Sequence, residues 1–439
     1  MGLLPDGDFA SLEQLNQHQQ QAWAQQSRYV ATHSAFYKQL WGMQQPPAQL
    51  ADISQLPLSD KAMLRLSQAV HPPYGNYLAA PSKQANRFHR TSGTTGQAMN
   101  LVMSADDSHI TEVIGGRCQS SAGLTPDHTV VHCLNYQMWM GGLTDHLTLE
   151  KTGATVVPFG VGNTELLIRT ILETDISAIS CTPSYPSVLE QVMKAKFPHL
   201  SPKDLGLKLG LFGGEPGLDD PHFKARLKDT WGIEARNANY GVSDVFCNFA
   251  GQCEHDTALH YMATDVLYPE LIDPDTEQPI EITKGAKGEL VLTHLQRQCQ
   301  PLVRFRTGDI IQITDTKPCS CQRTGMRFKV VGRSDDMVVV RGLNLFPTMV
   351  ATLVNNHSQL SGDYRIVLDS PPPYSHLPIH VELADGAIDL SAEQKQQLAS
   401  EFAQQIKQHL GASAQVTLLD ANSLPRIEGK TKRVIRNYS

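Results

Sequence analysis

The sequence predicts an α/β protein with a large N-terminal domain over residues 1–332 and a small α+β C-terminal domain over residues 333–439. Three observations support this prediction. Short β-branched runs alternate with stretches of helical spacing in the first half, which is typical of sheets flanked by helices. Strand signals then dominate residues 250–332. A glycine-containing turn precedes a remainder of about 105 residues, a reasonable size for a separate domain.

The elements of the first half follow from side-chain spacing. Residues 10–42 are polar and rich in Gln, with large apolar residues spaced as on one face of a helix. Apolar, β-branched runs that end in turns predict strands, and the stretches with helical spacing between them predict helices. The strands are expected at 130–134, 154–159, 177–183 and 207–217, and the helices at 166–175 and 185–197.

The second half carries a different pattern. The runs ELVLTHL, QPLVRFRTGDIIQIT and FKVVG follow one another without a helical stretch, which predicts a β subdomain over about residues 250–332. After the turn GRSD, at 332–335, come two strand-like runs, a long helix near 391–410 and another strand-like run. This order predicts a βαβ-like C-terminal domain, with DSPPPYSHLP as a loop between two strands.

Composition and charge exclude several classes of function. Of 439 residues, 41% are hydrophobic and 18% are charged, which is typical of a globular protein. The net charge of −7 argues against a protein that holds nucleic acid or an anionic membrane through its charge. Neither a signal peptide nor a transmembrane helix is expected, because no suitable apolar run is present. Eight scattered cysteines then indicate reduced thiols or metal ligands, and therefore a cytoplasmic protein.

The stretch RTSGTTGQAMN, at residues 90–100, is a candidate anion-binding loop. Its glycines let backbone amides approach an anion, and its hydroxyl groups donate hydrogen bonds. The pattern is not the Walker motif G-x-x-x-x-G-K-[ST]. Taken alone, an ordinary Ser/Thr/Gly turn explains the stretch equally well.

Five further segments favour the binding loop. FGGEPG, NANYGVSD, PLVRFRTGDI, GRSDDMVVVRGLNLFP and LPRIEGKTKRV each combine glycines with an acid and an aromatic or basic residue at a predicted strand end or turn. Ligands of open α/β sheets bind at such strand ends. Together and in this order, the segments resemble the adenylate-forming enzymes, and most closely the phenylacetate–coenzyme A ligase family. The resemblance covers nearly the whole chain.

The resemblance implies that ATP activates a carboxylic acid to an acyl-adenylate and that the acyl group then passes to a thiol. Two anions must meet while charge builds on the leaving pyrophosphate, so cations, amides and Mg²⁺ are needed at the phosphate oxygens. By resemblance, one group of residues wraps the β- and γ-phosphates and a second lines the adenine, the acyl group and the α-phosphate. The first group is Ser92, Gly93, Thr94, Thr95 and Gly96, and the second is Gly213, Gly214, Glu215, Pro216, Tyr240, Gly241, Val242 and Ser243.

Three residues depart from the family's usual pattern. Gln97 stands where Lys usually follows the loop, and Ala98 stands where Pro is common, so weaker phosphate affinity or loop closure is expected. Asp244 stands where the family usually has the Glu that serves Mg²⁺. Because Asp is one methylene shorter, coordination of Mg²⁺ through a water molecule is expected there.

Four residues near and beyond the expected domain boundary carry further implied roles. Asp309 would accept hydrogen bonds from both ribose hydroxyls, and Arg333 would be the second ribose contact. Asp335 is the implied hinge. Lys430 is the implied catalytic residue, whose ammonium would bridge the substrate carboxylate and the α-phosphate. Loss of one such contact typically lowers a rate by about 10²–10³-fold. The preceding glycine favours Lys430 over Lys432 for this role.

The segment NYQMWMGGLTDH, at residues 135–146, resembles the part of the family that lies beside an aryl group. Tyr136 and Trp139 would line the acid pocket, with Gly213 in its wall. Flat apolar walls suit an aromatic acid. For Trp139, plain core packing is nearly as good an explanation.

Cys253, His260, Cys319 and Cys321 form a candidate zinc site. Zn²⁺ binds four Cys or His ligands in a tetrahedron, commonly from short turns, and CEHDTALH and CSCQ are both turn-like. Some members of the resembled family have cysteines and a histidine at these places. Four protein ligands leave no open position, so a structural site is expected. His255 is a competing ligand, and reduced cysteines with a surface histidine are the alternative.

The leading hypothesis is an aryl-acid–coenzyme A ligase that uses ATP and Mg²⁺ and rotates its C-terminal domain between two half-reactions. Transfer to a carrier protein or an amine is an alternative, because the motifs concern ATP and not the acceptor. A nucleotide-binding protein without ligase activity is a third hypothesis, favoured by the three departures and opposed by intact Asp309, Arg333 and Lys430. The resemblance also implies a homodimer.

Overall fold

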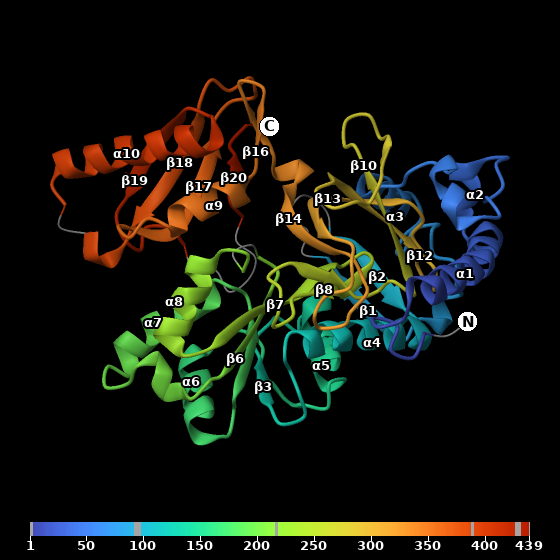
Figure 1. Cartoon of the computed structure of the whole chain (residues 1–439), viewed down its shortest axis with the longest axis horizontal. Helices are drawn as coiled ribbons and strands as arrows, with labels where there is room; N and C mark the ends of the chain where they lie inside the picture. The colour runs from blue at the N-terminus through green and yellow to red at the C-terminus, as the bar shows by residue number, and fades with distance from the viewer. Residues whose placement is uncertain (1–2, 92–97, 216–217, 388–389, 426–431, 439) are drawn as a thin grey trace.

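The structure is a computed structural model of the chain that describes residues 3–91, 98–215, 218–387, 390–425 and 432–438. Figure 1 shows a large body that contains the N-terminus and a smaller body, formed by the C-terminal residues, that sits at one end of it. Nowhere in the described ranges is there a helix with the length and apolar character needed to cross a bilayer.

The described residues of the large body share one twelve-stranded sheet, in the order β11-β10-β12-β13-β14-β9-β8-β7-β6-β5-β3-β4. The strands from β4 to β7 are parallel, and those from β8 to β11 are antiparallel to their neighbours. β7 joins the halves, because it pairs parallel with β6 and antiparallel with β8. The strands expected as a β subdomain therefore continue the parallel sheet.

The parallel half consists of β3 (Thr129–His132), β4 (Thr155–Pro158), β5 (Ala178–Cys181), β6 (Leu209–Gly213) and β7 (Glu234–Val242). The antiparallel half consists of β8 (Phe246–Gly251), β9 (Leu259–Tyr261), β10 (Leu267–Ile272), β11 (Pro279–Ile280), β12 (Lys287–His294), β13 (Phe305–Asp315) and β14 (Arg327–Arg333).

Both faces of the parallel half are buried, which confirms the predicted α/β class. Successive strand residues point to opposite faces, so Val131 and Ile179 pack in one core with α6, α7 and α8. Val130 and Ala178 pack in another, with residues that follow α4 and with α5. The helices are α4 (Ala105–Ser121), α5 (Met140–Glu150), α6 (Thr164–Glu173), α7 (Tyr185–Lys196) and α8 (Pro221–Trp231).

The N-terminal helices cover the antiparallel half (Figure 1). Trp23, Tyr37 and Leu64 share a core with Phe305 and Phe328 of β13 and β14. The expected helical segment is divided at Ser34, whose hydroxyl accepts the Tyr37 N–H and caps the second helix. These helices are α1 (Leu12–His33), α2 (Ala35–Trp41) and α3 (Lys61–Val70).

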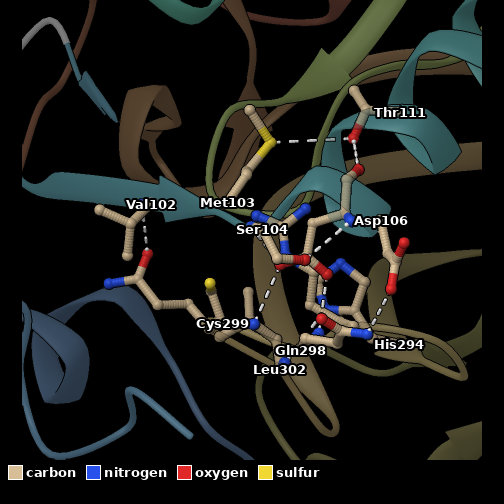
Figure 2. Close-up of polar contacts among 12 residues, drawn as sticks. Val102, Met103, Ser104, Asp106, Thr111, His294, Gln298, Cys299 and Leu302 are labelled. Atoms are coloured by element: carbon tan, nitrogen blue, oxygen red, sulfur yellow. Dashed lines mark hydrogen bonds and ion pairs between the residues drawn. The ribbon is translucent and has the colours of Figure 1, made fainter. Parts of the chain in front are cut away.

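β1 (Arg87–Arg90) and β2 (Asn100–Met103) form a separate hairpin, and the candidate anion-binding loop connects the two strands. Its base is tied to the connection between β12 and β13. The Asp107 carboxylate, at the start of α4, accepts the N–H groups of Gln298 and Cys299 at 2.7 and 2.9 Å. The Gln300 side chain accepts the Val102 N–H at 3.0 Å. Figure 2 shows these contacts, which position the hairpin against the large sheet.

The small body is an α+β unit whose sheet has the order β19-β18-β17-β20 among the described residues. β18, α10 and β19 form the predicted βαβ unit, because β18 and β19 are parallel. α10 packs on β19 and α9 on β17. Its elements are β15 (Val338–Val340), β16 (Leu343–Leu345), α9 (Pro347–Asn355), β17 (Leu360–Leu368), β18 (Leu377–Leu383), α10 (Ala392–Leu410), β19 (Ala414–Leu419) and β20 (Val434–Arg436).

Candidate active site

The structure brings Tyr240, Asp309 and Arg333 together. Asp309 and Arg333 are register partners on β13 and β14, and an Arg333 Nη donates to Asp309 Oδ1 at 2.7 Å. The Tyr240 hydroxyl donates to Asp309 Oδ2 at 2.7 Å. Arg333 also donates to both carboxylate oxygens of Asp335, at 2.8 and 3.2 Å. The expected ribose contacts and the expected hinge therefore form one connected group.

Burial and nearby charges shift the pKa values of Tyr240 and Arg333 in this group. Asp309 is 6% exposed and faces the Arg333 guanidinium. Burial and the nearby Asp309 carboxylate raise the pKa of Tyr240 far above its ordinary value, so its hydroxyl stays a donor. Burial opposes the charge on Arg333, but Asp309 and Asp335 raise its pKa above the ordinary value. Asp309 is thus held as an acceptor from two sides.

The last residues of β7 require a glycine at position 241. A Cβ on Gly241 would lie 1.8 Å from the Cys247 carbonyl oxygen on β8, so no side chain fits there. The Val245 N–H donates to the Val242 carbonyl at 2.8 Å and closes the turn that contains Ser243. The Tyr240 ring meets Phe249 and Phe328 edge-on, with ring centroids 5.3 and 5.4 Å away. These contacts fix the ring expected beside adenine.

Asp244, the expected Mg²⁺ acid, is buried and paired. Its Oδ2 accepts Lys61 Nζ of α3 at 2.8 Å. Its Oδ1 is buried without a hydrogen-bond partner among the described residues. Sequence reasoning missed Lys61, because its partner lies 183 residues away. The sequence did offer one signal for the position of Lys61. Asp60 is a typical helix N-cap, and its carboxylate caps α3, which begins at Lys61.

The expected adenine and acyl wall lies at the end of β6. A Cβ on Gly213 would lie 2.5 Å from Asn239 Cβ, so the two strands approach closely there. Gly214 has φ +81°, a left-handed conformation that favours glycine. Glu215 Oε2 accepts the Ser184 N–H at 3.2 Å. Pro216 lies outside the described residues.

The structure describes only the flanks of the candidate anion-binding loop and of the expected catalytic lysine. Ser92, Gly93, Thr94, Thr95, Gly96 and Lys430 lie outside the described residues. The base of the loop is closed by Thr91 and Met99, which exchange two hydrogen bonds. The Thr91 N–H donates to the Met99 carbonyl at 3.0 Å, and the Met99 N–H donates to Thr91 Oγ1 at 2.9 Å.

The expected acid-binding segment lies beside the β1–β2 hairpin. The Arg90 N–H donates to the Met138 carbonyl at 2.8 Å. Trp139 precedes α5, and its ring lies over Gly141, where a Cβ would meet it at 2.8 Å. The Tyr136 hydroxyl lies 2.9 Å from His146 Nδ1. Aromatic rings thus collect near the end of β3, next to the end of β5.

Asp145 forms a buried polar cluster that the sequence did not reveal. Its carboxylate contacts Cys247 Sγ at 2.9 Å and accepts a short hydrogen bond from the Asn239 side chain. Burial raises the pKa of Asp145 to about 7, although these hydrogen bonds oppose the shift. Because Asn239 precedes Tyr240 and packs on Gly213, this cluster supports both adjoining motifs.

Cys253, His260, Cys319 and Cys321 meet between the β8–β9 and β13–β14 connections, and their donor atoms lie within 4.8 Å of one another. The Sγ atoms of Cys253 and Cys319 are 3.9 Å apart. A tetrahedron with metal–sulfur bonds of about 2.3 Å places two sulfur atoms about 3.8 Å apart. His260 Nε2 lies 3.3 Å from Cys253 Sγ and 3.9 Å from Cys321 Sγ. The donor set fits Zn²⁺.

The competing ligand, His255, points elsewhere and lies 3.3 Å from Glu254. Burial, helped by Arg327 and Arg323, lowers the pKa of His260 to about 4, so its ring is neutral and able to bind a metal. Burial raises the pKa of Cys253 to about 12, but a coordinating metal deprotonates a thiol. Burial also opposes ionisation of Cys319, yet hydrogen bonds from Cys321 lower its pKa.

Comparison with known proteins supports the family resemblance that the sequence motifs indicate. The AMP-binding enzyme family matches residues 84–296, and the AMP-binding enzyme C-terminal domain matches residues 342–437. The phenylacetate-coenzyme A ligase of Pseudomonas putida is 31% identical over 98% of this chain and 96% of its own length. That of Aromatoleum evansii is 33% identical over 88% and 85%. The chain belongs to the phenylacetate–coenzyme A ligase family.

Solved structures agree with this family assignment. A 2-hydroxyisobutyryl-CoA ligase in its postadenylation state, 26% identical, superimposes with a TM-score of 0.89 over 99% of this chain and 94% of its own. The same enzyme in its thioesterification state is 27% identical, covers 99% and 94%, and gives 0.70. The two bodies of the present chain are therefore arranged more like those of that ligase in its postadenylation state than in its thioesterification state.

Proposed function

We propose that this chain joins a carboxylic acid to coenzyme A through an acyl-adenylate, with an aromatic acid as substrate. The observation that carries the proposal is the group of Tyr240, Asp309 and Arg333, in a chain similar over most of its length to phenylacetate-coenzyme A ligases. ATP supplies the energy and AMP leaves with the second step. Family membership supports the thiol acceptor.

Asp309 suits a ribose. A carboxylate accepts about four hydrogen bonds. Tyr240 and Arg333 occupy one position on each oxygen and hold the plane of the group fixed. One further position on each oxygen can accept the two neighbouring ribose hydroxyls. The protein thereby fixes the nucleoside before the chemistry, which is the purpose of a preorganised site.

The first half-reaction needs positive charge at the phosphates. Residues 92–96 would wrap the β- and γ-phosphates with amides and hydroxyls, and Lys430 would bring its ammonium to the carboxylate and the α-phosphate. Mg²⁺, when bound, would offset charge on the phosphate oxygens. The buried, unpartnered Oδ1 of Asp244 fits a role in holding it through water.

The acid would enter beside Tyr136, Trp139 and Gly213. Tyr136 and Trp139 offer flat faces, and Gly213 keeps one wall free of a side chain. A 2-hydroxyisobutyryl-CoA ligase shares the fold, so the fold accepts small aliphatic acids in that protein. The aromatic residues here favour an aryl acid.

The second half-reaction would follow a rotation of the C-terminal domain about Asp335. Asp335 lies at the start of the connection between β14 and β15, and its carbonyl accepts Arg436 of β20 at 3.1 Å. The arrangement resembles a postadenylation state, so rotation would next present a different face of the small domain to the adenylate.

We also propose a structural Zn²⁺ held by Cys253, His260, Cys319 and Cys321. The donor separations and the neutral His260 support it. Four protein ligands leave no position for a substrate. The metal would join two connections of the antiparallel half at the start of β14, where Arg327 pairs with His260.

The test is acid-dependent exchange of labelled pyrophosphate into ATP, without coenzyme A, over aromatic and aliphatic acids. Exchange with an aromatic acid should fall by about 10²–10³-fold in Lys430→Ala and persist in the matched control Lys432→Ala. Thioester formation on adding coenzyme A then identifies the acceptor. Exchange without thioester would favour a carrier protein or an amine. Nucleotide binding without exchange for any acid would support a binding protein without ligase activity.

A further inference from the structure

We propose that Lys61 is a polyphosphate-binding residue of the candidate ATP site. This inference rests on the proposed function, since it concerns the ATP of that reaction. It adds a residue from α3, outside all the motifs that define the site. The contacts that carry it are those between Lys61 and Asp244.

Lys61 is placed at the phosphate side of the site by Asp244. The ammonium lies 2.8 Å from Asp244 Oδ2, and the side chains are 34% and 2% exposed. An ammonium has three donors, and one is used here. The remaining donors belong to a partly exposed group, while the carboxylate below is buried. Asp244 thus fixes the lysine without consuming its capacity to bind an anion.

A second observation indicates that a ligand belongs there. Asp244 Oδ1 is buried and has no partner among the described residues, although Oδ2 is satisfied. An unpartnered buried carboxylate oxygen is costly, so it marks a position that a bound group completes. A hydrated Mg²⁺ suits that oxygen, and the phosphates it accompanies would then lie within reach of Lys61.

The segment around Lys61 is also fixed to two other motifs. The Ser59 N–H donates to the carbonyl of Arg304, just before β13, at 2.9 Å, and the Ser59 carbonyl accepts the N–H of Arg306 in β13 at 2.8 Å, a few residues before Asp309. Gln68 pairs with the N–H and carbonyl of Asn100, at 2.9 and 2.7 Å, at the start of β2. One segment therefore connects the ribose strand, the Asp244 turn and the base of the anion-binding loop. Lys61 cannot move far from the site.

Charge and geometry predict a selective effect. A residue that binds the β- and γ-phosphates matters for ATP and not for AMP, whereas a residue that only supports the fold matters for both. Charge-assisted hydrogen bonds correspond to about 10- to 100-fold in affinity. We expect Lys61→Met to weaken ATP binding by that factor and to leave AMP binding within about twofold.

The experiment measures dissociation constants for Mg²⁺-ATP and AMP by calorimetry on the full chain. The matched control is Lys395→Met, because Lys395 also pairs with an aspartate at 2.8 Å and is 32% exposed, but lies on α10. It should change neither constant. Lys61→Arg should recover part of the ATP affinity. If Lys61→Met unfolds, Lys61→Gln, which can still donate to Asp244, gives the same comparison.

Parallel loss of ATP and AMP binding in Lys61→Gln would show a structural role and overturn the inference, as would unchanged ATP binding. A wild-type chain that binds neither nucleotide would instead overturn the proposed function itself. Retained AMP binding with weakened ATP binding supports both.

Discussion

Asp309 is the residue through which the candidate site is most tightly organised. Its oxygens are shared between an uncharged donor, Tyr240, and a charged one, Arg333. Both bonds end on the carboxylate, but only the bond from Arg333 joins two opposite charges in a salt bridge, at 2.7 Å. The two donors therefore contribute unequally, which gives substitutions at this group a defined order of severity.

We expect Asp309→Asn to weaken ATP and AMP binding alike, by about 10- to 100-fold, because the amide N–H₂ would face a donor and the ribose would lose an acceptor. Calorimetry with both nucleotides measures this. Tyr240→Phe removes only the neutral donor and should cost about 10-fold or less. A larger loss in Tyr240→Phe than in Asp309→Asn would contradict this order.

Asp145 predicts a pH dependence of stability. Its folded pKa, about 7, is above the ordinary value of 3.8, so the folded chain keeps a proton that the unfolded chain releases. Its contribution to stability is therefore lost as pH rises from about 4 to 7. Asp145→Asn removes this loss and should gain about 1–3 kcal/mol relative to wild type between pH 5 and 8.

Urea unfolding at pH 5 and pH 8 measures this difference. Asp107→Asn is the contrasting variant, because the carboxylate of Asp107 accepts backbone N–H groups and Arg297 lies beside it. Although burial opposes the shift, Arg297 lowers the pKa of Asp107, so its contribution should not decline over this range. A pH-independent difference between Asp145→Asn and wild type would refute the assignment.

Sequence patterns predicted the site residues that lie in short glycine-containing motifs, and the structure brings Tyr240, Asp309 and Arg333 together. The sequence patterns did not predict a role for Lys61 or Asp145. Lys61 meets Asp244 across 183 positions, and Asp145 meets Asn239 across 94. Lys61 lies outside the quoted motifs, and Asp145 lies in the segment 135–146 but received no role there. What distinguishes each residue is a distant partner. Only the folded chain supplies that information.

At the scale of elements, the connections that carry the cysteines would help to hold β9 in the antiparallel half. β9 pairs with β8 on one side and with β14 on the other. It carries His260, while Cys253 lies in the β8–β9 connection and the other two donors lie in the β13–β14 connection. β9 has only three residues, so few main-chain hydrogen bonds hold it. A metal that joins both connections would compensate for this short ladder.

We expect one Zn²⁺ per chain by elemental analysis, and its loss in the double variant Cys319→Ser, Cys321→Ser. The melting temperature should fall by roughly 5 °C or more, since removing a structural metal costs several kcal/mol and a chain of this size shifts by a few degrees for each. Cys181→Ala is the control, because Cys181 is a buried thiol on β5. Metal retained in the double variant would exclude this site.

Several elements were predicted from spacing, and others were not, for physical reasons. The strands and helices of the parallel half have strong apolar periodicity. β7 was not predicted, because RNANYGV is rich in Asn and Gly, which disfavour strands. Its conformation is imposed by pairing with β6 and β8. β20 is likewise imposed, since its three residues pair with β17.

At the scale of the whole molecule, the two bodies meet at a connection that also belongs to the site. Arg333 pairs with Asp309 in the large body and with Asp335 at the connection. Arg436, from the last strand, donates to the Asp335 carbonyl. A rotation of the small domain would therefore disturb the proposed ribose contact through Arg333.

Asp335→Pro tests the proposed rotation. Proline fixes φ at about −65°, so a hinge that must change φ is blocked. We expect pyrophosphate exchange to persist and thioester formation to fall by about tenfold or more. Asp335→Ala is the control, because it also releases Arg333 but leaves the backbone free. Equal loss in both variants would assign the effect to the Arg333 pair and not to rotation.

The anchors around Lys430 limit how far this lysine travels by itself. The Leu424 N–H donates to Glu382 at 2.8 Å, and the Arg433 carbonyl accepts the Ile366 N–H at 2.8 Å. Lys430 is three positions before the second anchor, a distance of about 10 Å when the chain is fully extended. Lys430 would therefore move together with the small domain. If the small domain turns as proposed, Lys430 would leave the active site when another face of that domain enters it. Adenylation and thioester formation would then follow one another in a fixed order.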